Sequence, residues 1–155
     1  MIEQMPWLLI DVGNTAIKWR LANAEVLLDA GNSVSDVSSL CKAVEAEHWG
    51  VAGLASVASD AADAELIAAL TASGARAVHC ARAQSTCLGL VSSYADPERM
   101  GVDRWLAMLA AYARNEGALC VIDAGTAVTV DLVSAEGEHE GGYILPGADL
   151  MRRAL

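Results

Sequence analysis

Basic side chains are scarce in this chain. The 155 residues include 10 Lys and Arg against 20 Asp and Glu, a formal net charge of -10 at pH 7. A nucleic acid backbone and an anionic membrane surface both attract cationic proteins. The charge therefore argues against nucleic acid and membrane as partners.

Long apolar runs are also lacking. No stretch approaches the roughly 18 consecutive apolar residues that a membrane-spanning helix needs. The opening "MIEQMPWLLID" combines an acidic residue with a short apolar run, which is not the pattern of a secretory signal. Apolar residues nevertheless make up 54% of the chain, enough for a globular core. We expect a cytoplasmic, globular protein.

The few cysteines form no C-x-x-C pair. Cys41 and Cys120 lie in apolar segments, where buried free thiols are common. Cys80, with His79 beside it, and Cys87 match no standard zinc spacing. We expect reduced thiols and no structural metal.

What the chain does have is an acid at the end of an apolar run, in "LLIDVGNTAIKWRLA" at residues 8–22. Trp7 to Ile10 reads as a strand covered on both faces, and the alternation from Ala16 to Leu21 predicts a second strand. Asp11 should therefore lie at a strand end, in a turn. The turn has two interpretations: an ordinary hairpin corner, or a glycine loop whose amides and Thr15 hydroxyl face a phosphate, with Asp11 beside a hydrated Mg²⁺.

A second copy of this layout favours the phosphate loop. Residues 119–133, "LCVIDAGTAVTVDLV", again place an acid, Asp123, at the end of an apolar strand, followed by Gly125 and Thr126. Two such hairpins facing a cleft could grip one polyphosphate. Their two carboxylates would then require cations.

Strands alternate with helices elsewhere, which predicts an α/β fold with a mixed sheet flanked by helices. Ser35 and Asp60 are plausible N-caps of two helices, and Gly74 should end the second. Short strands are expected at residues 26–30, with Gly31 and Asn32 ending the first of them, at 49–58, at 75–80 and at 143–145.

The segment "DPERMGVDRWLAMLAAYARN", residues 96–115, predicts one helix with Asp96 at its cap. Asp103 would share a face with apolar Met100 and Ala107, where a charge is costly unless it is paired or used. Arg104 points about 100° away from it on a helix, so it is no simple partner. The alternative interpretation is that Asp103 is a partly exposed acid at the start of the helix, where the helix dipole favours a negative charge.

These blocks together resemble type III pantothenate kinase, of the acetate/sugar kinase, heat-shock and actin superfamily. The two acid-glycine loops, Asp11 to Lys18 and Asp123 to Asp131, are the first and third blocks. Tyr94-x-x-Pro97-x-x-x-Gly101-x-Asp103-Arg104 matches the family's pantothenate motif, and Gly141-Gly142-x-Ile144-x-Pro146-Gly147 matches its next block. Four blocks in order cover the chain nearly end to end.

The resemblance implies ATP-dependent phosphorylation of pantothenate to 4'-phosphopantothenate, the first step of coenzyme A biosynthesis. It implies an actin-like ATPase (ribonuclease H-like) fold, with a first domain at 1–115, the start of an incomplete second domain at 116–155, and a homodimer at full length. Three interpretations of this length remain open: a fragment, a truncated gene product or an inactive domain.

The resemblance also assigns residues. Asp103 would accept the proton, Asp11 would help hold Mg²⁺ through the phosphates, and Asp123 would bind a monovalent cation, K⁺ or NH₄⁺. The substrate-binding set would be Tyr94, Gly101, Val102, Asp103 and Arg104. The ATP-binding set would be Asp11, Val12, Gly13, Asn14, Thr15, Ala16, Ile17, Lys18 and Thr126.

Two other functions remain open at this point. The chain could be a non-catalytic nucleotide- or pantothenate-binding regulatory module derived from such a kinase. It could instead be a sugar or acetate kinase or an actin-like ATPase, but that leaves the block from Tyr94 to Arg104 unexplained.

Overall fold

The computed structural model describes residues 5–23, 32–45 and 47–154. The chain divides into two compact units, Met1–Ala81 (unit 1) and Arg82–Leu155 (unit 2), and each is described by itself. Within unit 2, helix α3 (Val102–Tyr112) packs on strands β8 (Leu119–Ala124) and β9 (Ala127–Val133). The expected domains at 1–115 and 116–155 stay a prediction.

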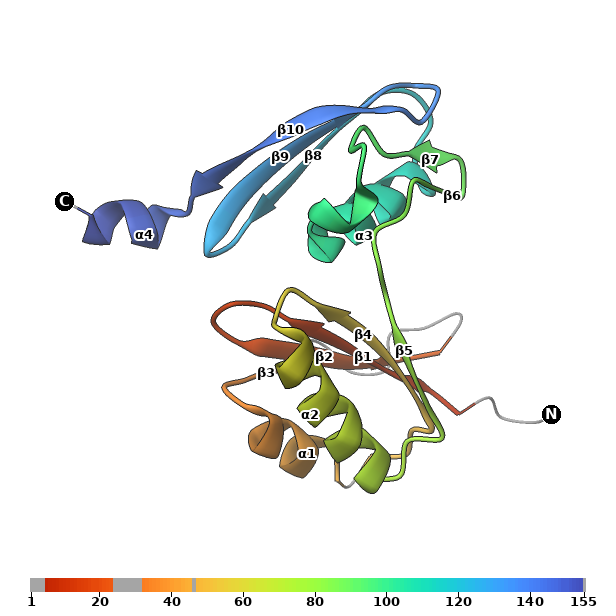
Figure 1. The fold of residues 1–155 in the computed structure, drawn as a ribbon, viewed down its shortest axis with the longest axis vertical. Coiled ribbons are helices and arrows are strands. Elements are labelled where there is room, and N and C mark those ends of the chain that lie inside the picture. Colours follow the sequence, from red (N-terminus) through yellow and green to blue (C-terminus); the bar gives the residue numbers. More distant parts are fainter. Residues whose placement is uncertain (1–4, 24–31, 46, 155) are drawn as a thin grey trace. The chain divides into compact units, whose positions relative to one another are not determined.

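Unit 1 is a five-stranded mixed sheet with two helices (Figure 1). The strand order is β3-β2-β1-β4-β5, with β1 antiparallel to β2 and parallel to β4. The predicted mixed sheet is confirmed. Its elements are β1 (Trp7–Val12), β2 (Ile17–Ala22), β3 (Asn32–Val34), α1 (Val37–Val44), β4 (Val51–Ser56), α2 (Asp60–Ala72) and β5 (Ala77–Cys80).

The third strand of unit 1 differs from its prediction. Residues 26–30 lie outside the described residues, and Asn32, which was expected to end a strand, instead begins β3. β3 pairs antiparallel with β2.

Both helices of unit 1 lie on one face of its sheet (Figure 1). Leu8 and Ile10 of β1 are buried there with Leu40 of α1 and Leu66 of α2. On the other face Trp7 and its strand neighbour Leu9 remain 42% and 38% exposed. The expectation that this strand is covered on both faces was wrong, because the described helices cover only one.

Two helix starts differ by one residue from their predictions. Asp36, and not Ser35, caps α1, because its carboxylate accepts a hydrogen bond from the Ser39 amide at 2.8 Å. Ser59, and not Asp60, caps α2. Adjacent residues of these types are all good caps, so sequence alone does not choose between them. Gly74, in the left-handed region at φ +104°, follows the end of α2 as expected.

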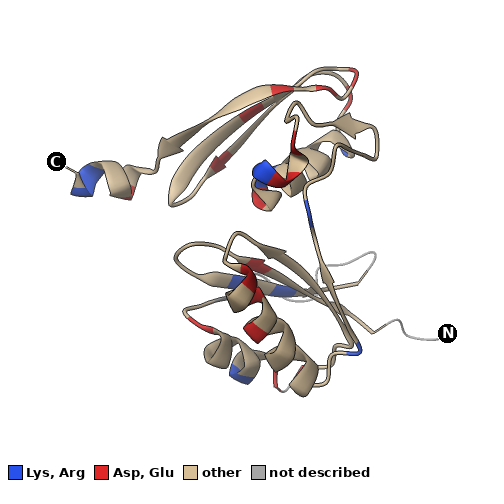
Figure 2. Ribbon diagram, viewed as in Figure 1, with Lys and Arg blue, Asp and Glu red and all other residues tan. Residues whose placement is uncertain are grey.

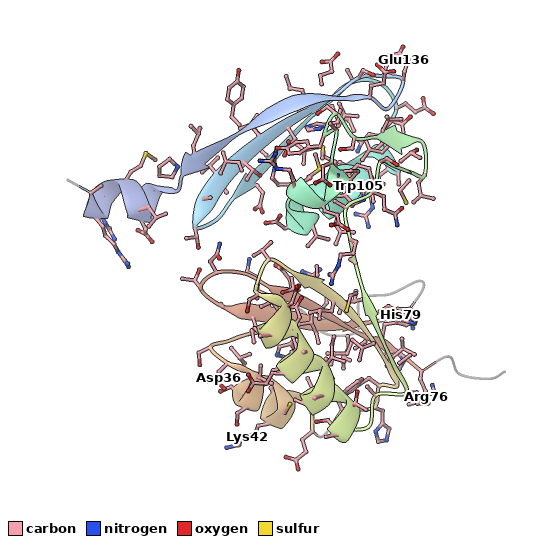
Figure 3. All side chains as sticks on the ribbon, viewed as in Figure 1. Asp36, Lys42, Arg76, His79, Trp105 and Glu136 are labelled. Carbon is pink, nitrogen blue, oxygen red and sulfur yellow. The ribbon has the colours of Figure 1, made fainter. Side chains whose placement is uncertain are left out.

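Unit 2 is built on a three-stranded antiparallel sheet of order β10-β9-β8. Trp105 of α3 is the largest fully buried side chain and packs with Met108 and Val133 (Figure 3). None of the described helices is long and apolar enough to cross a membrane. The remaining elements are β6 (Thr86–Cys87), β7 (Leu90–Val91), a 3₁₀ turn (Pro97–Arg99), β10 (His139–Pro146) and α4 (Ala148–Arg153).

One face of this sheet carries apolar side chains that α3 does not cover. Ile122, Val130 and Tyr143 stand opposite one another across the three strands and therefore share a face. Ile122 is 63% exposed and Tyr143 is 71% exposed, and Leu132 and Leu145 on the same face are also exposed. We call these four exposed residues, Ile122, Leu132, Tyr143 and Leu145, the open face.

The helix expected over 96–115 is broken. Asp96 caps only the 3₁₀ turn, Met100 is extended (φ -83°, ψ 132°), and α3 begins after Gly101. The break places Met100 outside α3, and within α3 Asp103 is exposed while Arg104 is buried. Placing Asp103 on a buried apolar face was therefore wrong.

Candidate functional site

The first hairpin loop, residues 13–16, joins β1 to β2 in unit 1. Asp11 is not in the turn, as was expected, but is the penultimate residue of β1, opposite Lys18 of β2 and beside Ala55 of β4. The strand continues one residue further because Val12 still pairs with Ile17. All eight residues expected to bind ATP in this unit therefore belong to one hairpin.

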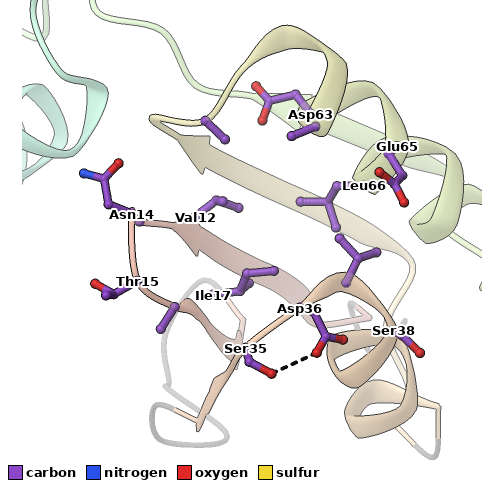
Figure 4. Close-up of a pocket in the computed structure, with 15 residues that line it drawn as sticks. Val12, Asn14, Thr15, Ile17, Ser35, Asp36, Ser38, Asp63, Glu65 and Leu66 are labelled. Atoms are coloured by element: carbon purple, nitrogen blue, oxygen red, sulfur yellow. Dashed lines mark hydrogen bonds between the residues drawn. The ribbon is translucent and has the colours of Figure 1, made fainter.

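A pocket of about 550 Å³ lies beside this loop (Figure 4). One wall is Val12 to Ile17, and the others are the starts of α1 and α2. The pocket thus lies where β1 ends, the edge at which open α/β sheets bind their ligands.

The pocket walls are acidic. They include Asp36, Asp63 and Glu65, and no Lys or Arg stands among the described residues that line them. Figure 2 shows acidic residues at the start of α2. The amide of Ser39 and the hydroxyl of Ser35 donate to Asp36 and hold its pKa below the ordinary value of 3.8. A polyanion would enter such a pocket only together with cations.

The buried carboxylate in this pocket has its own donor. Ser56 Oγ donates to Asp63 Oδ1 at 2.5 Å, which ties the end of β4 to the first turn of α2. The same hydroxyl accepts from the Ala58 amide at 3.1 Å. The buried carboxylate of Asp63 therefore has a structural role, which is to join β4 to α2.

The second hairpin, in unit 2, repeats the first. Asp123 is the penultimate residue of β8 and is exposed, opposite Thr129 of β9. The amide of Gly125 donates to Ala127 O at 2.9 Å, as that of Gly13 donates to Ala16 O at 3.1 Å. Here too, Asp123 lies inside the strand and not at its end.

Neither loop glycine is required by its own backbone. Gly13 and Gly125 do not have positive φ, and an added Cβ would come no nearer than 3.5 Å and 3.8 Å to other atoms. A Cβ at either position would thus make only ordinary van der Waals contact. Thr126 is the residue of the second loop that was expected to contact ATP. Its backbone carbonyl oxygen accepts a hydrogen bond from the amide of Gly147, just before α4, at 2.9 Å.

Asp103 lies in the first turn of α3. Its Oδ1 accepts from the Arg104 amide at 2.8 Å, so the carboxylate turns back over the start of the helix. A Cβ at Gly101 would lie 2.5 Å from that oxygen. The glycine of this motif thus leaves room for the carboxylate.

Arg104 is buried in unit 2 and donates three hydrogen bonds to its neighbours. Nε donates to Asp131 Oδ2 at 3.0 Å, Nη2 donates to Asp131 Oδ1 at 2.5 Å, and Nη1 donates to Tyr94 Oη at 3.2 Å. The hydrogen bonds with Asp131 raise the pKa of Arg104 above its ordinary value. The guanidinium is therefore always charged.

Asp131 has a second partner. His139 Nε2 lies 3.0 Å from Asp131 Oδ1, and His139 Nδ1 lies 2.9 Å from Ser93 Oγ. The sequence motif placed Tyr94 and Arg104 in one site, but it gave no role to Ser93, Asp131 or His139. A signal was available, because Asp131 alternates in β9 with buried Val133, and a charge on a core-facing strand position calls for a partner.

The structure thus sorts the expected site residues into three places. The loop from Asp11 to Lys18 belongs to unit 1. Thr126, with Asp123, belongs to the second hairpin, and the segment from Tyr94 to Arg104 meets Asp131 within unit 2.

Comparison with known proteins gives consistent matches along the chain. The family model described as type III pantothenate kinase matches residues 7–155. Curated proteins of that name are 45% identical over 151 residues in Marinobacter nauticus and 42% identical over 156 residues in Cellvibrio japonicus, each covering 96% of this chain. The chain covers 62% and 61% of those two proteins, so it spans about three fifths of their length.

Among solved structures, a Ppx/GppA phosphatase of Aquifex aeolicus is similar with a TM-score of 0.50 and 13% identity. The match covers 97% of this chain and 55% of that one. At this identity the likeness concerns the fold alone.

Proposed function

Because the chain belongs to the type III pantothenate kinase family and has the actin-like ATPase fold, we propose that it phosphorylates pantothenate with ATP, giving 4'-phosphopantothenate, the first step of coenzyme A biosynthesis. The observation that carries the proposal is the family match over residues 7–155. That span includes both acid-glycine hairpins and the segment from Tyr94 to Arg104. We place the reaction in the cytoplasm and expect a homodimer.

The loop from Asp11 to Lys18 is the proposed site for the ATP phosphates, with Thr126 contacting ATP from the second hairpin. Glycine at positions 13 and 125 supports this role, since a residue without a side chain lets a phosphate oxygen come close to the backbone of the turn. Asp11 and Lys18 face each other across β1 and β2, on the same side of the sheet.

Cations are part of the proposal. The acidic pocket beside the first loop fits a nucleotide only as a complex with Mg²⁺, which Asp11 would help to hold through the phosphates. Mg²⁺ beside a nucleotide is commonly held by one or two carboxylates together with phosphate oxygens and water. Exposed Asp123 is the proposed ligand of K⁺ or NH₄⁺, and cations of this kind neutralise phosphate charge in transfer reactions.

Asp103 is the proposed proton acceptor. In the transfer, the hydroxyl oxygen of pantothenate bonds to the γ-phosphorus of ATP, ADP leaves, and the hydroxyl proton passes to the carboxylate. Phosphoryl transfer depends mostly on positioning and charge neutralisation, so one carboxylate at the acceptor hydroxyl is sufficient protein chemistry. Asp103 is exposed and held at the start of α3 through Oδ1, which leaves Oδ2 for the hydroxyl.

The acceptor pocket is proposed to include Tyr94, Gly101, Val102, Asp103 and Arg104. Pantothenate carries a carboxylate, and the planar guanidinium of Arg104 is the donor group that best matches a carboxylate.

A coupled assay for ADP release, with pantothenate and ATP as substrates, tests the kinase. We expect ADP release that requires pantothenate. A folded chain that releases no ADP contradicts the proposal.

The alternative function is a non-catalytic module that binds nucleotide or pantothenate. The chain spans about three fifths of the relatives that it matches. Calorimetry with ATP and with pantothenate separates the two, since binding without ADP release supports the module.

A further inference from the structure

We propose that Asp131 is a positioning residue of the pantothenate site, which fixes the guanidinium of Arg104 for the substrate carboxylate, and that His139 and Ser93 hold Asp131 in turn. The inference rests on the proposed function. It gives a role to the side chains of Asp131, His139 and Ser93, which have none in the proposed reaction.

The contact between Asp131 and Arg104 is bidentate. Asp131 takes the Nε and Nη2 edge of the guanidinium, at 3.0 Å and 2.5 Å. The side chains of Arg104 and Asp131 are 5% and 2% exposed. Planar paired hydrogen bonds of this kind fix orientation as well as distance. The long arginine side chain, which has many rotamers in solution, is thereby held in one.

The remaining donors of Arg104 suit a second carboxylate. A guanidinium has five N–H bonds, and the contacts with Asp131 and Tyr94 use three of them. Within the described residues this leaves one N–H on Nη1 and one on Nη2. While Asp131 occupies the other edge, this pair of N–H bonds is the part of the guanidinium left for a substrate carboxylate.

Asp131 is itself held from the far side. His139 Nε2 shares Asp131 Oδ1 with Arg104, and Ser93 Oγ meets His139 Nδ1. Tyr94, the next residue, reaches Arg104 with its hydroxyl and lies nearly parallel to the His139 ring at 6.2 Å between centroids. The dipeptide at 93–94 thus contacts both ends of the chain of polar groups, which links the position of Arg104 to one short segment.

A glycine makes room for this arrangement. Gly142 of β10 stands opposite Asp131 of β9, and a Cβ there would collide with Asp131 Oδ1 and with Arg104 Nη2. A substituent at 142 would therefore displace the carboxylate from the guanidinium without altering either charged residue.

The test compares two ligands on the 155-residue chain by calorimetry. One is pantothenate, and the other is pantothenyl alcohol, in which CH₂OH replaces the carboxylate. The variants are Asp131→Asn and Ser93→Ala, and the matched control is Asp149→Asn, which changes an exposed Asp paired with Arg152. Far-UV circular dichroism establishes that each variant is folded.

We expect the parent chain and the control to prefer pantothenate over the alcohol. Asp131→Asn should weaken pantothenate binding by roughly 10- to 100-fold and alcohol binding by less than about twofold, because a charged hydrogen bond is lost only for the carboxylate. Ser93→Ala leaves the Arg104–Asp131 pair in place and should weaken pantothenate binding by about threefold.

Three other results are possible, and each one tests the inference. If the parent binds no pantothenate, the proposed function and this inference both fail. If folded variants keep the parent's preference, or lose both ligands equally, the inference alone fails, since the three side chains are then only structural. If Asp131→Asn does not fold, Ser93→Ala decides by the same criterion.

Discussion

The buried ion pair between Arg104 and Asp131 predicts that substitutions of its two members change the free energy of unfolding in a strongly non-additive way. Arg104→Met and Asp131→Leu each remove one partner and keep an apolar side chain in the space. The first leaves Asp131 with His139 at 3.0 Å, and the second leaves Arg104 with the Tyr94 hydroxyl at 3.2 Å. In both cases a charge stays in a site from which water is excluded.

The expected magnitudes follow from that burial. Removing one member of a buried pair leaves an uncompensated charge, so each single variant should lose about 3 kcal/mol of unfolding free energy. The double variant buries no unpaired charge, and His139 alone loses its partner, so its loss should not exceed about 3 kcal/mol. The two changes should therefore couple by about 3 kcal/mol, at the upper end for residues in contact.

Urea unfolding followed by tryptophan fluorescence measures these losses. Trp105 lies next to Arg104 in the sequence, is 1% exposed, and reports on unit 2. Asp149→Leu is the control, because its ion pair is 77% exposed on both sides and should contribute less than about 1 kcal/mol. Single losses below about 1 kcal/mol, or losses that simply add in the double variant, would refute the reasoning.

Three further predictions concern the reaction and the first unit. Asp103→Asn should reduce ADP release by about 100-fold or more while ATP affinity in calorimetry changes less than about twofold, and near-normal turnover would remove Asp103 from the role of proton acceptor. Replacing K⁺ by Na⁺ should lower ADP release in the parent, and indifference to the cation would count against a cation site at Asp123. Asp36→Ala should lower the unfolding midpoint at pH 7, since Asp36 caps α1. Because hydrogen bonds from Ser39 and Ser35 lower the folded pKa of Asp36 below 3.8, its contribution is present above that pH and lost as pH falls through the folded value. The difference between parent and variant should shrink there, and one that stays constant down to pH 2 to 3 would contradict this account.

The features predicted correctly from sequence are those that local pattern determines. The mixed sheet flanked by helices was expected from alternating strands and helices and is confirmed. The two acid-glycine hairpins were also found from sequence, because each consists of neighbouring strands whose alternation is visible in the chain. Their roles in binding ATP and cations stay predictions.

The features that were missed depend on contacts distant in sequence. Asp131 and Arg104 are 27 positions apart, and no local pattern pairs them. The helix break at Met100 and Gly101 was also missed, and it places Met100 outside the helix that holds Asp103. Within α3, Asp103 is exposed and Arg104 is buried. Which side of α3 turns inward depends on its packing against β8 and β9, which are also distant in sequence.

The open face of unit 2 has a practical consequence for handling the protein. Ile122, Leu132, Tyr143 and Leu145 form an apolar strip of exposed side chains on one face of the sheet of unit 2. Apolar strips of this kind adsorb dyes, detergent micelles and one another. Sedimentation and scattering profiles of this polypeptide should depend on its concentration, and a charge placed at position 143 should reduce that dependence.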